Sequence, residues 1–281
     1  MASANTYLEV VMELNELNTY GKFLEDTFKL RSLPIGVKFY ESAADVPEEA
    51  VFPLKEYGKH MAVCQAFSYA RRKGKTIAMT KEDHWCWNPL IGYGCVSCEP
   101  GEPQFDEVIK YIGIPDREKA SAFFQKFPRL PLHKYEAVVM APISTATFLP
   151  DVIMIYADVA KINYFVRCIK GVLGDYIHSV FDGIDSCIYC TLPTFTEGKF
   201  RITLPDPGER ERALTRDDEV ILSIPPAQMD AFMKSVEANQ RLGFHDKGIE
   251  INLDYSRPPF YNRLFEMWGL EKGANWDLTS E

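Results

Sequence analysis

Two uninterrupted apolar runs of strand length limit most strongly what this chain can fold into. Residues 137–141 read AVVMA and residues 152–156 read VIMIY. Such runs are typical of strands covered on both faces, because a strand with one face in water alternates apolar and polar residues. A helical pattern follows the second run, with apolar residues at helical spacing over 158–169 and a glycine at position 171. Alternating strands and helices predict an α/β or α+β fold in layers.

Other segments extend this alternation. Strands are predicted at 35–40, 76–80, 199–204 and 220–224, and helices at 64–73, 105–112, 117–127, 226–236 and 261–268. Near the N-terminus, residues 7–17 and 22–30 are predicted to form two helices, because Asn18 to Gly21 interrupts the pattern with poor helix formers.

A weak internal repeat runs through these elements. In each half a strand is followed by a cysteine, a short helical segment, a Gly-Lys pair and another strand. The cysteines are Cys64 and Cys187, and the pairs are Gly74-Lys75 and Gly198-Lys199. The order predicts two pseudo-symmetric halves that form one compact unit, residues 1–130 and 131–243, followed by a tail of residues 244–281. The alternative is that short strand–helix units recur by chance.

Charge and hydropathy exclude several classes of function. The formal net charge of −9 and the pI near 5.2 argue against nucleic acid or an anionic membrane surface as a partner. The N-terminal residues lack the pattern of a signal peptide, and no apolar run approaches the roughly 18 residues of a membrane helix. A cytoplasmic protein is therefore expected. Seven cysteines without a secretion signal suggest thiols or metal ligands rather than disulfides.

Four of the seven cysteines lie between Cys64 and Cys98. The pairs Cys95-x-x-Cys98 and Cys187-x-x-Cys190 could together bind zinc, although their separation is longer than in a compact zinc ribbon. One pair could instead be a redox dithiol, or simply two thiols in a loop. Cys168 lies in an apolar helical pattern and is predicted to be core.

The densest polar and aromatic cluster is Asp83-His84-Trp85-Cys86-Trp87. His84 could ligate a metal or activate Cys86, and with Asp83 these residues are the candidate catalytic groups. The alternative for His84 is an ordinary half-buried histidine. The common nucleotide-binding and hydrolase motifs are absent from the sequence.

Several motifs occur together, in order, over residues 33–238: Pro34-Ile-Gly-Val-Lys38, Cys64-Gln65, Gly74-Lys75, Glu82-Asp83-His84 with Cys86, Ala141-Pro142, Pro150-Asp151-Val152, Cys187, Gly198, Thr203-Leu204, Gly208 with Arg210, and Asp217-Asp218-Glu219. On these motifs the chain resembles the family catalogued as domain of unknown function 169, found in archaea and anaerobic bacteria. The family supplies no established activity.

The resemblance implies four recurrent cysteines, two in each half. Three of them match Cys64, Cys86 and Cys187, whereas the fourth position is Asp206. This departure leaves open whether a carboxylate, Cys190 or the Cys95/Cys98 pair completes the set. We expect Cys64, Cys86, Cys187 and Asp206 to converge as metal ligands, with Cys64, Lys75 and Arg210 as the cofactor-binding residues.

Two functions of different classes remain open. The first is an iron–sulfur protein, with zinc as the alternative metal, acting as an anaerobic redox protein or enzyme on a small organic substrate or with a redox partner protein. An iron–sulfur-dependent oxidoreductase or lyase is the corresponding enzyme. The second is a metal-free protein that binds a small molecule in a cleft between the halves, or an accessory subunit. A homodimer is expected through the N-terminal helices or the tail that carries Trp268 and Trp276.

Overall fold

The computed structural model describes residues 12–239 and 259–269, and its central feature is one six-stranded sheet. The strands are β1 (Ile35–Tyr40), β2 (Ile77–Thr80), β3 (Ala137–Pro142), β4 (Val152–Asp158), β5 (Arg201–Thr203) and β6 (Glu219–Ile224). Their order across the sheet is β2-β3-β1-β4-β6-β5, and every pair is antiparallel. The predicted mixture of helices and strands is confirmed, with each strand where the sequence places it to within a few residues.

The strand order is the same on the two sides of the sheet. β1 and β4 pair at the centre, β3 and β6 lie next to them, and β2 and β5 form the edges. In each half the first strand (β1 or β4) lies at the centre, the second (β2 or β5) at the edge and the third (β3 or β6) between them, as expected of a duplicated unit. This order groups β3 with β1 and β2, so the sheet divides after residue 142. The predicted division at residues 130 and 131 stays a prediction.

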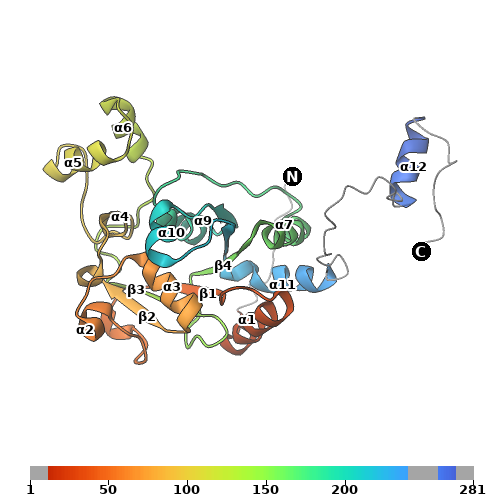
Figure 1. Cartoon of the computed structure of the whole chain (residues 1–281), viewed down its shortest axis with the longest axis horizontal. Helices are drawn as coiled ribbons and strands as arrows, with labels where there is room; N and C mark the ends of the chain where they lie inside the picture. Colours follow the sequence, from red (N-terminus) through yellow and green to blue (C-terminus); the bar gives the residue numbers. More distant parts are fainter. Residues whose placement is uncertain (1–11, 240–258, 270–281) are drawn as a thin grey trace, which may run out of the picture. The chain divides into compact units, whose positions relative to one another are not determined.

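Helices cover both faces of the sheet (Figure 1). α1 (Leu14–Phe28), α7 (Val159–Leu173) and α11 (Met229–Ala238) pack on one face. The other face is covered by α3 (Val63–Lys73), α4 (Trp87–Gly92), α8 (Ser186–Tyr189) and α9 (Leu192–Glu197), whereas α5 (Pro103–Tyr111) and α6 (Arg117–Phe124) pack on each other away from the sheet (Figure 1) and extend the same core. In β4, Met154 and Tyr156 point to this second face, whereas Ile153 and Ile155 point to the first. The uninterrupted apolar runs are explained, since both faces are buried.

Short elements complete the main unit. They are α2 (Pro53–Tyr57), α10 (Pro207–Ala213) and three 3₁₀ turns, η1 (Ala43–Asp45), η2 (Lys81–Asp83) and η3 (Pro226–Gln228). The chain forms two compact units, 1–242 and 243–281, and in the second the structure describes α12 (Pro259–Met267). Within the described residues, no helix is both long and apolar enough to cross a membrane.

The prediction of two N-terminal helices divided at Asn18 to Gly21 is wrong for the described residues. α1 is continuous through this segment, because tertiary contacts stabilise it there. The Asn18 amide donates to the carbonyl oxygens of Ile143 (2.7 Å) and Ala146 (3.2 Å). A side chain at Gly21 would come within 2.6 Å of the Ser144 backbone nitrogen. The glycine thus permits close packing of the helix on this loop.

The predicted homodimer concerns residues only partly described. Residues 1–11 and Trp276 lie outside the described part of the chain, whereas Trp268 follows α12 and is largely exposed. The homodimer stays a prediction.

Candidate thiol and carboxylate site

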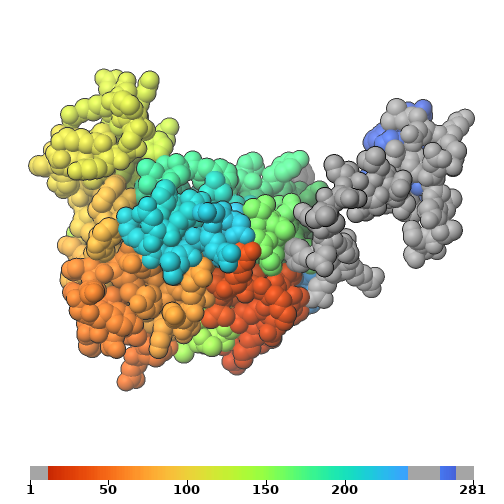
Figure 2. All heavy atoms as spheres, in the orientation of Figure 1, coloured from red at the N-terminus to blue at the C-terminus, as the bar shows by residue number. Residues whose placement is uncertain are grey.

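Four short segments of chain begin at one junction beside the sheet. Cys64 lies in the first turn of α3, Cys187 lies in α8, and Cys86 and Asp206 are the residues that precede α4 and α10. Cys64 packs with Ala62, Ala213 and Cys86. α10 packs against α3, and Figure 2 shows this region (cyan) lying against that of α3 (orange).

We call this group the thiol–carboxylate cluster; its members are Cys64, Cys86, Cys187, Cys190, Asp206 and Glu209. The Cys187 thiol interacts electrostatically with Cys64, Asp206, Cys190 and Cys86. Cys64 and Cys86 pack together, and both act with Asp206 on the pKa of Cys187, whereas the convergence of all four at one point stays a prediction. Their role as metal ligands stays a prediction.

Asp206 joins two of the segments. Its Oδ1 accepts a hydrogen bond from the Glu209 backbone nitrogen (2.8 Å), which caps α10. Its Oδ2 accepts one from the Ser186 backbone nitrogen (3.0 Å) at the start of α8. Both carboxylate oxygens are therefore engaged in holding the backbone of the cluster.

Glu209 is the most deeply buried carboxylate of the cluster, with 1% of its surface exposed. The Tyr156 hydroxyl donates to its Oε1 at 2.7 Å. Its Oε2 and Ser186 Oγ are both buried, and the Ser186 hydroxyl is close enough to the carboxylate to act on it as a hydrogen-bond partner. Burial raises the pKa of Glu209 to about 7, against the opposing effect of the Tyr156 hydrogen bond and of the nearby Ser186 hydroxyl.

The thiols of the cluster favour the protonated form. Burial, followed by the charges of Glu209 and Asp206, raises the pKa of Cys64 to about 12. Burial likewise holds the pKa of Cys187 and Cys190 well above the usual range. A helix start favours the thiolate form of a cysteine, but burial and neighbouring carboxylates outweigh that effect here.

Asp185 lies at the edge of the cluster and was not predicted. It precedes α8 with a left-handed backbone (φ 58°), and its carboxylate accepts a hydrogen bond from the Asn88 amide. Burial, then the charges of Asp182 and Asp206, raises the pKa of Asp185 to about 7. The Cys86 thiol donates to Asn88 Oδ1 at 3.1 Å, so Asn88 links Cys86 to Asp185.

Asp83, one of the predicted catalytic residues, holds two backbone segments in place through its carboxylate. Its carboxylate accepts hydrogen bonds from the backbone nitrogens of Leu54 and Thr80 and from the Thr80 hydroxyl, each at 2.9 Å. These bonds fix the start of α2 and the turn after β2. With its carboxylate used in this way, Asp83 is not placed to act with Cys86.

His84 faces away from the thiol–carboxylate cluster. It packs edge-on against Tyr93 and lines a cavity of about 10 Å³, together with Cys95 and Tyr135. Burial lowers the pKa of His84 to about 4, and its Nδ1 has no hydrogen-bond partner among the described residues. His84 and Cys86 belong to different surroundings, so the structure does not support activation of Cys86 by His84.

Cys64 and Lys75, two of the predicted cofactor-binding residues, lie at opposite ends of α3. Lys75 is exposed beyond the C-terminal end of α3, whereas Cys64 lies in the first turn of that helix. The Arg210 Nε lies 3.4 Å from an oxygen of the exposed Asp217. The structure therefore leaves Cys64 at the cluster and Lys75 away from it.

The remaining cysteines lie in several different surroundings. Cys190 is fully buried beside Cys187 and belongs to the cluster. Cys98 is packed in the core, Cys95 lines the His84 cavity, and Cys168 is buried in α7, as its pattern predicts. The two CxxC pairs are not drawn into one group of four.

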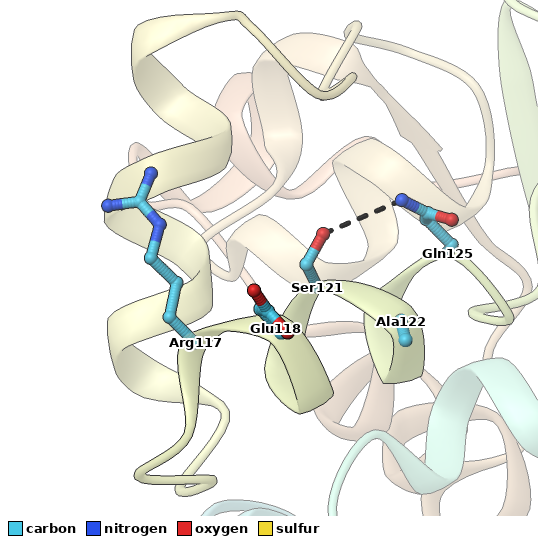
Figure 3. A pocket seen from close by; sticks show the side chains of 5 residues that line it. All are labelled: Arg117, Glu118, Ser121, Ala122 and Gln125. Carbon is cyan, nitrogen blue, oxygen red and sulfur yellow. Dashed lines mark hydrogen bonds between the residues drawn. The ribbon is translucent and has the colours of Figure 1, made fainter.

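A surface hollow of about 450 Å³ lies along α6 and is lined by Arg117, Glu118, Ser121, Ala122 and Gln125 (Figure 3). All of its lining residues belong to one short stretch of chain, and none is a cysteine or a buried acid. The hollow therefore offers no chemistry comparable to that of the cluster.

The donor atoms of the cluster match a thiolate-rich metal site in chemistry. Sulfur donors suit iron–sulfur centres and zinc. Within residues 12–239 and 259–269, no three or more His, Cys, Asp and Glu side chains are already arranged to hold a metal ion. Binding would require the thiols to turn toward a common point.

Comparison with known proteins places most of the chain in one group. A family model described as "Uncharacterised ArCR", domain of unknown function 169, matches residues 23–235. The uncharacterized protein MJ0308 of Methanocaldococcus jannaschii is 26% identical over 232 residues, which cover 80% of this chain and 96% of the relative. No solved structure matches.

Proposed function

Because the chain belongs to the "Uncharacterised ArCR" family, domain of unknown function 169, we propose its function from the thiol–carboxylate cluster. The proposal is a cysteine-ligated metal protein that acts as an anaerobic redox protein or enzyme on a small organic substrate. The observation that carries it is the gathering of Cys64, Cys86 and Cys187 with buried carboxylates at one junction. An iron–sulfur centre is the preferred group and zinc the alternative.

The electrostatics of the cluster set a condition that a bound metal would have to meet. The acidic side chains and thiols of the cluster crowd together, and each of Cys64, Cys86, Cys187, Cys190 and Glu209 has a raised pKa. Arg212 is a cation that favours the charged form of Cys86. A bound metal ion would supply the positive charge that lets several buried thiols lose their protons together.

The chain's own residues would then have separate tasks. Cys64, Cys86 and Cys187 would hold the metal, and Asp206 would keep the starts of α8 and α10 together through its backbone hydrogen bonds. An iron–sulfur centre would supply one-electron transfer or, at an incompletely ligated iron, Lewis-acid activation of a substrate. A soluble redox partner or a small molecule in the cytoplasm would be the reactant.

Anaerobic purification tests this function. We expect visible absorbance and stoichiometric iron and sulfide, both lost in Cys64→Ala and Cys86→Ala. Cys168→Ala is the control, because Cys168 is also a buried cysteine but lies in α7 on the other face of the sheet. Loss of metal in Cys168→Ala alone, or a metal-free native chain, would contradict the proposal.

A metal-free binding protein is the second candidate, favoured by the protonated state of the thiols. The exposed Trp85, beside Cys86 in sequence, stacks under the Arg212 guanidinium at 4.8 Å and could contact a flat, anionic small molecule. This reading expects Cys64→Ala and Cys86→Ala to leave the metal content at background. Quenching of tryptophan fluorescence by such a compound, lost in Trp85→Ala, would support it.

A further inference from the structure

We infer that Cys64 and Cys86 form a redox-active dithiol that undergoes thiol–disulfide exchange with a low-molecular-weight disulfide. The inference goes beyond the proposed metal site, because it concerns the chain without metal and needs only these two thiols. Both cysteines are free in the structure, which therefore represents the reduced form. The exchange would join Cys64 Sγ to Cys86 Sγ and release two small thiols.

A backbone bridge brings the two cysteine-bearing segments side by side. Met61 and His84 pair in a parallel bridge, in which the Met61 backbone donates to and accepts from residues 83–85 at 2.8 and 2.9 Å. Segments bridged in this way lie about 5 Å apart, a separation similar to that between the Cα atoms of a disulfide. Cys64 and Cys86 follow this bridge directly, each at the start of a helix.

The side chains of the two cysteines are also in contact. Cys64 and Cys86 pack against each other in a small apolar cluster with Ala62 and Ala213. Burial and, after it, nearby carboxylates raise the pKa of Cys64, but they act against the charged thiolate and not against a neutral disulfide. These surroundings therefore slow the exchange without opposing its product.

The two thiols differ in access, and this difference assigns their roles. Cys64 exposes 8% of its surface, whereas Cys86 is half-buried and follows the exposed Trp85. The Arg212 guanidinium lies 4.8 Å from the centre of the Trp85 ring and favours the charged form of Cys86. Cys86 is therefore the thiol that attacks an incoming disulfide, and Cys64 is the thiol that resolves the intermediate.

Asn88 restrains the side chain of the attacking thiol. The Cys86 thiol donates to Asn88 Oδ1 at 3.1 Å, and the buried Asn88 amide donates in turn to the Asp185 carboxylate. In this orientation Cys86 already packs against Cys64. Little rotamer freedom is therefore lost when the two sulfur atoms join.

The exchange has two balanced steps. The Cys86 thiolate attacks one sulfur of the small disulfide, forms a mixed disulfide and releases the other sulfur as a thiolate. The Cys64 thiolate then attacks the Cys86 sulfur, closes the intramolecular bond and releases the second small thiolate. The two small thiolates take up the two protons that the cysteines lose, so the protein pair is oxidised by two electrons and the small disulfide is reduced to two thiols.

Incubation of the reduced, chelator-treated full chain with glutathione disulfide tests the inference, with acid quenching, alkylation and peptide mass mapping as the readout. We expect an intramolecular bond between Cys64 and Cys86, with two glutathione molecules released per chain. Cys64→Ala should stop at the mixed disulfide and retain glutathione on Cys86, whereas Cys86→Ala should lose the reaction. Cys187→Ala is the matched control, because it removes a neighbouring buried thiol and should keep the bond.

Three results would overturn the inference. They are a bond between another pair of cysteines, a folded unaltered chain that forms no bond, and loss of the bond in Cys187→Ala. Glutathione retained on Cys64 in Cys86→Ala, as readily as on Cys86 in Cys64→Ala, would reverse the assigned roles and overturn that part of the inference. Circular dichroism checks the fold of each variant, and the mapping of the unaltered chain decides the bond even where a variant does not fold.

The metal content of the natively purified chain is a separate measurement. A chain that forms the bond but binds no metal would support the dithiol and refute the proposed function. A chain that binds metal but forms no bond after chelation would have the opposite meaning, so the two failures are distinguishable.

Discussion

Replacing Arg71 by methionine should destabilise the protein far more than removal of an ordinary surface arginine. Arg71 lies on α3, and 1% of its surface is exposed. Its guanidinium donates to Thr215 Oγ1 (2.7 Å) and Ser32 Oγ (3.2 Å) and lies 3.5 Å from Glu219 Oε1. The Glu219 side chain is fully buried as well. Arg71 thus connects α3 to the start of β6 without access to water.

The expected magnitude follows from the carboxylate that the substitution leaves behind. Breaking a buried ion pair by removing one partner costs about 3–5 kcal/mol, because the remaining charge is uncompensated. Arg72 lies 3.6 Å from Glu219 Oε2 and is partly exposed, so its compensation is weaker. We therefore expect Arg71→Met to lower the free energy of unfolding by about 3 kcal/mol. Adding Glu219→Gln should restore much of this loss.

Urea unfolding followed by circular dichroism measures these changes. Arg31→Met is the matched control, because Arg31 pairs with Asp218 at 2.7 Å but both side chains are substantially exposed. It should leave the stability nearly unchanged. The reasoning is refuted if the two single variants unfold alike, or if the effects of Arg71→Met and Glu219→Gln simply add.

Three other outcomes are expected. In the metal-free protein, His84 should stabilise the fold above pH 6.5, and this stabilisation should be lost toward pH 4, because the folded pKa of about 4 lies below the unfolded value. The expected loss in the free energy of unfolding is about 3 kcal/mol. His84→Phe should not show this loss when its unfolding is measured as a function of pH. Gly21→Ala should cost about 1–3 kcal/mol in thermal unfolding, since the new Cβ would lie 2.6 Å from a backbone nitrogen, and a stabilised variant would contradict this contact. Asp83→Ala should cost about 3 kcal/mol through its lost hydrogen bonds and leave the metal content per folded chain unchanged; selective loss of metal would show a role at the site.

The local elements of this protein could be predicted from the sequence because they depend on short-range patterns. The runs at 137–141 and 152–156 are strands buried on both faces, and Gly74 ends α3 in a left-handed conformation (φ 65°). Asp116 caps α6 through the Lys119 backbone nitrogen. The order of strands, cysteines and Gly-Lys pairs predicts two related halves; the sheet has the same strand order on its two sides, and the duplication itself stays a prediction.

The chemistry of the site depended on contacts between distant parts of the chain. Sequence motifs singled out Cys64, Cys86 and Cys187, but their pattern carries no information on burial or neighbouring charge. Only the packing of α10 against α3 places Glu209 beside Cys64, and only the alternation of β4 toward that face brings Tyr156 to its carboxylate. The raised pKa of these thiols therefore arises from the tertiary structure, because desolvation and charge act through space and not along the chain.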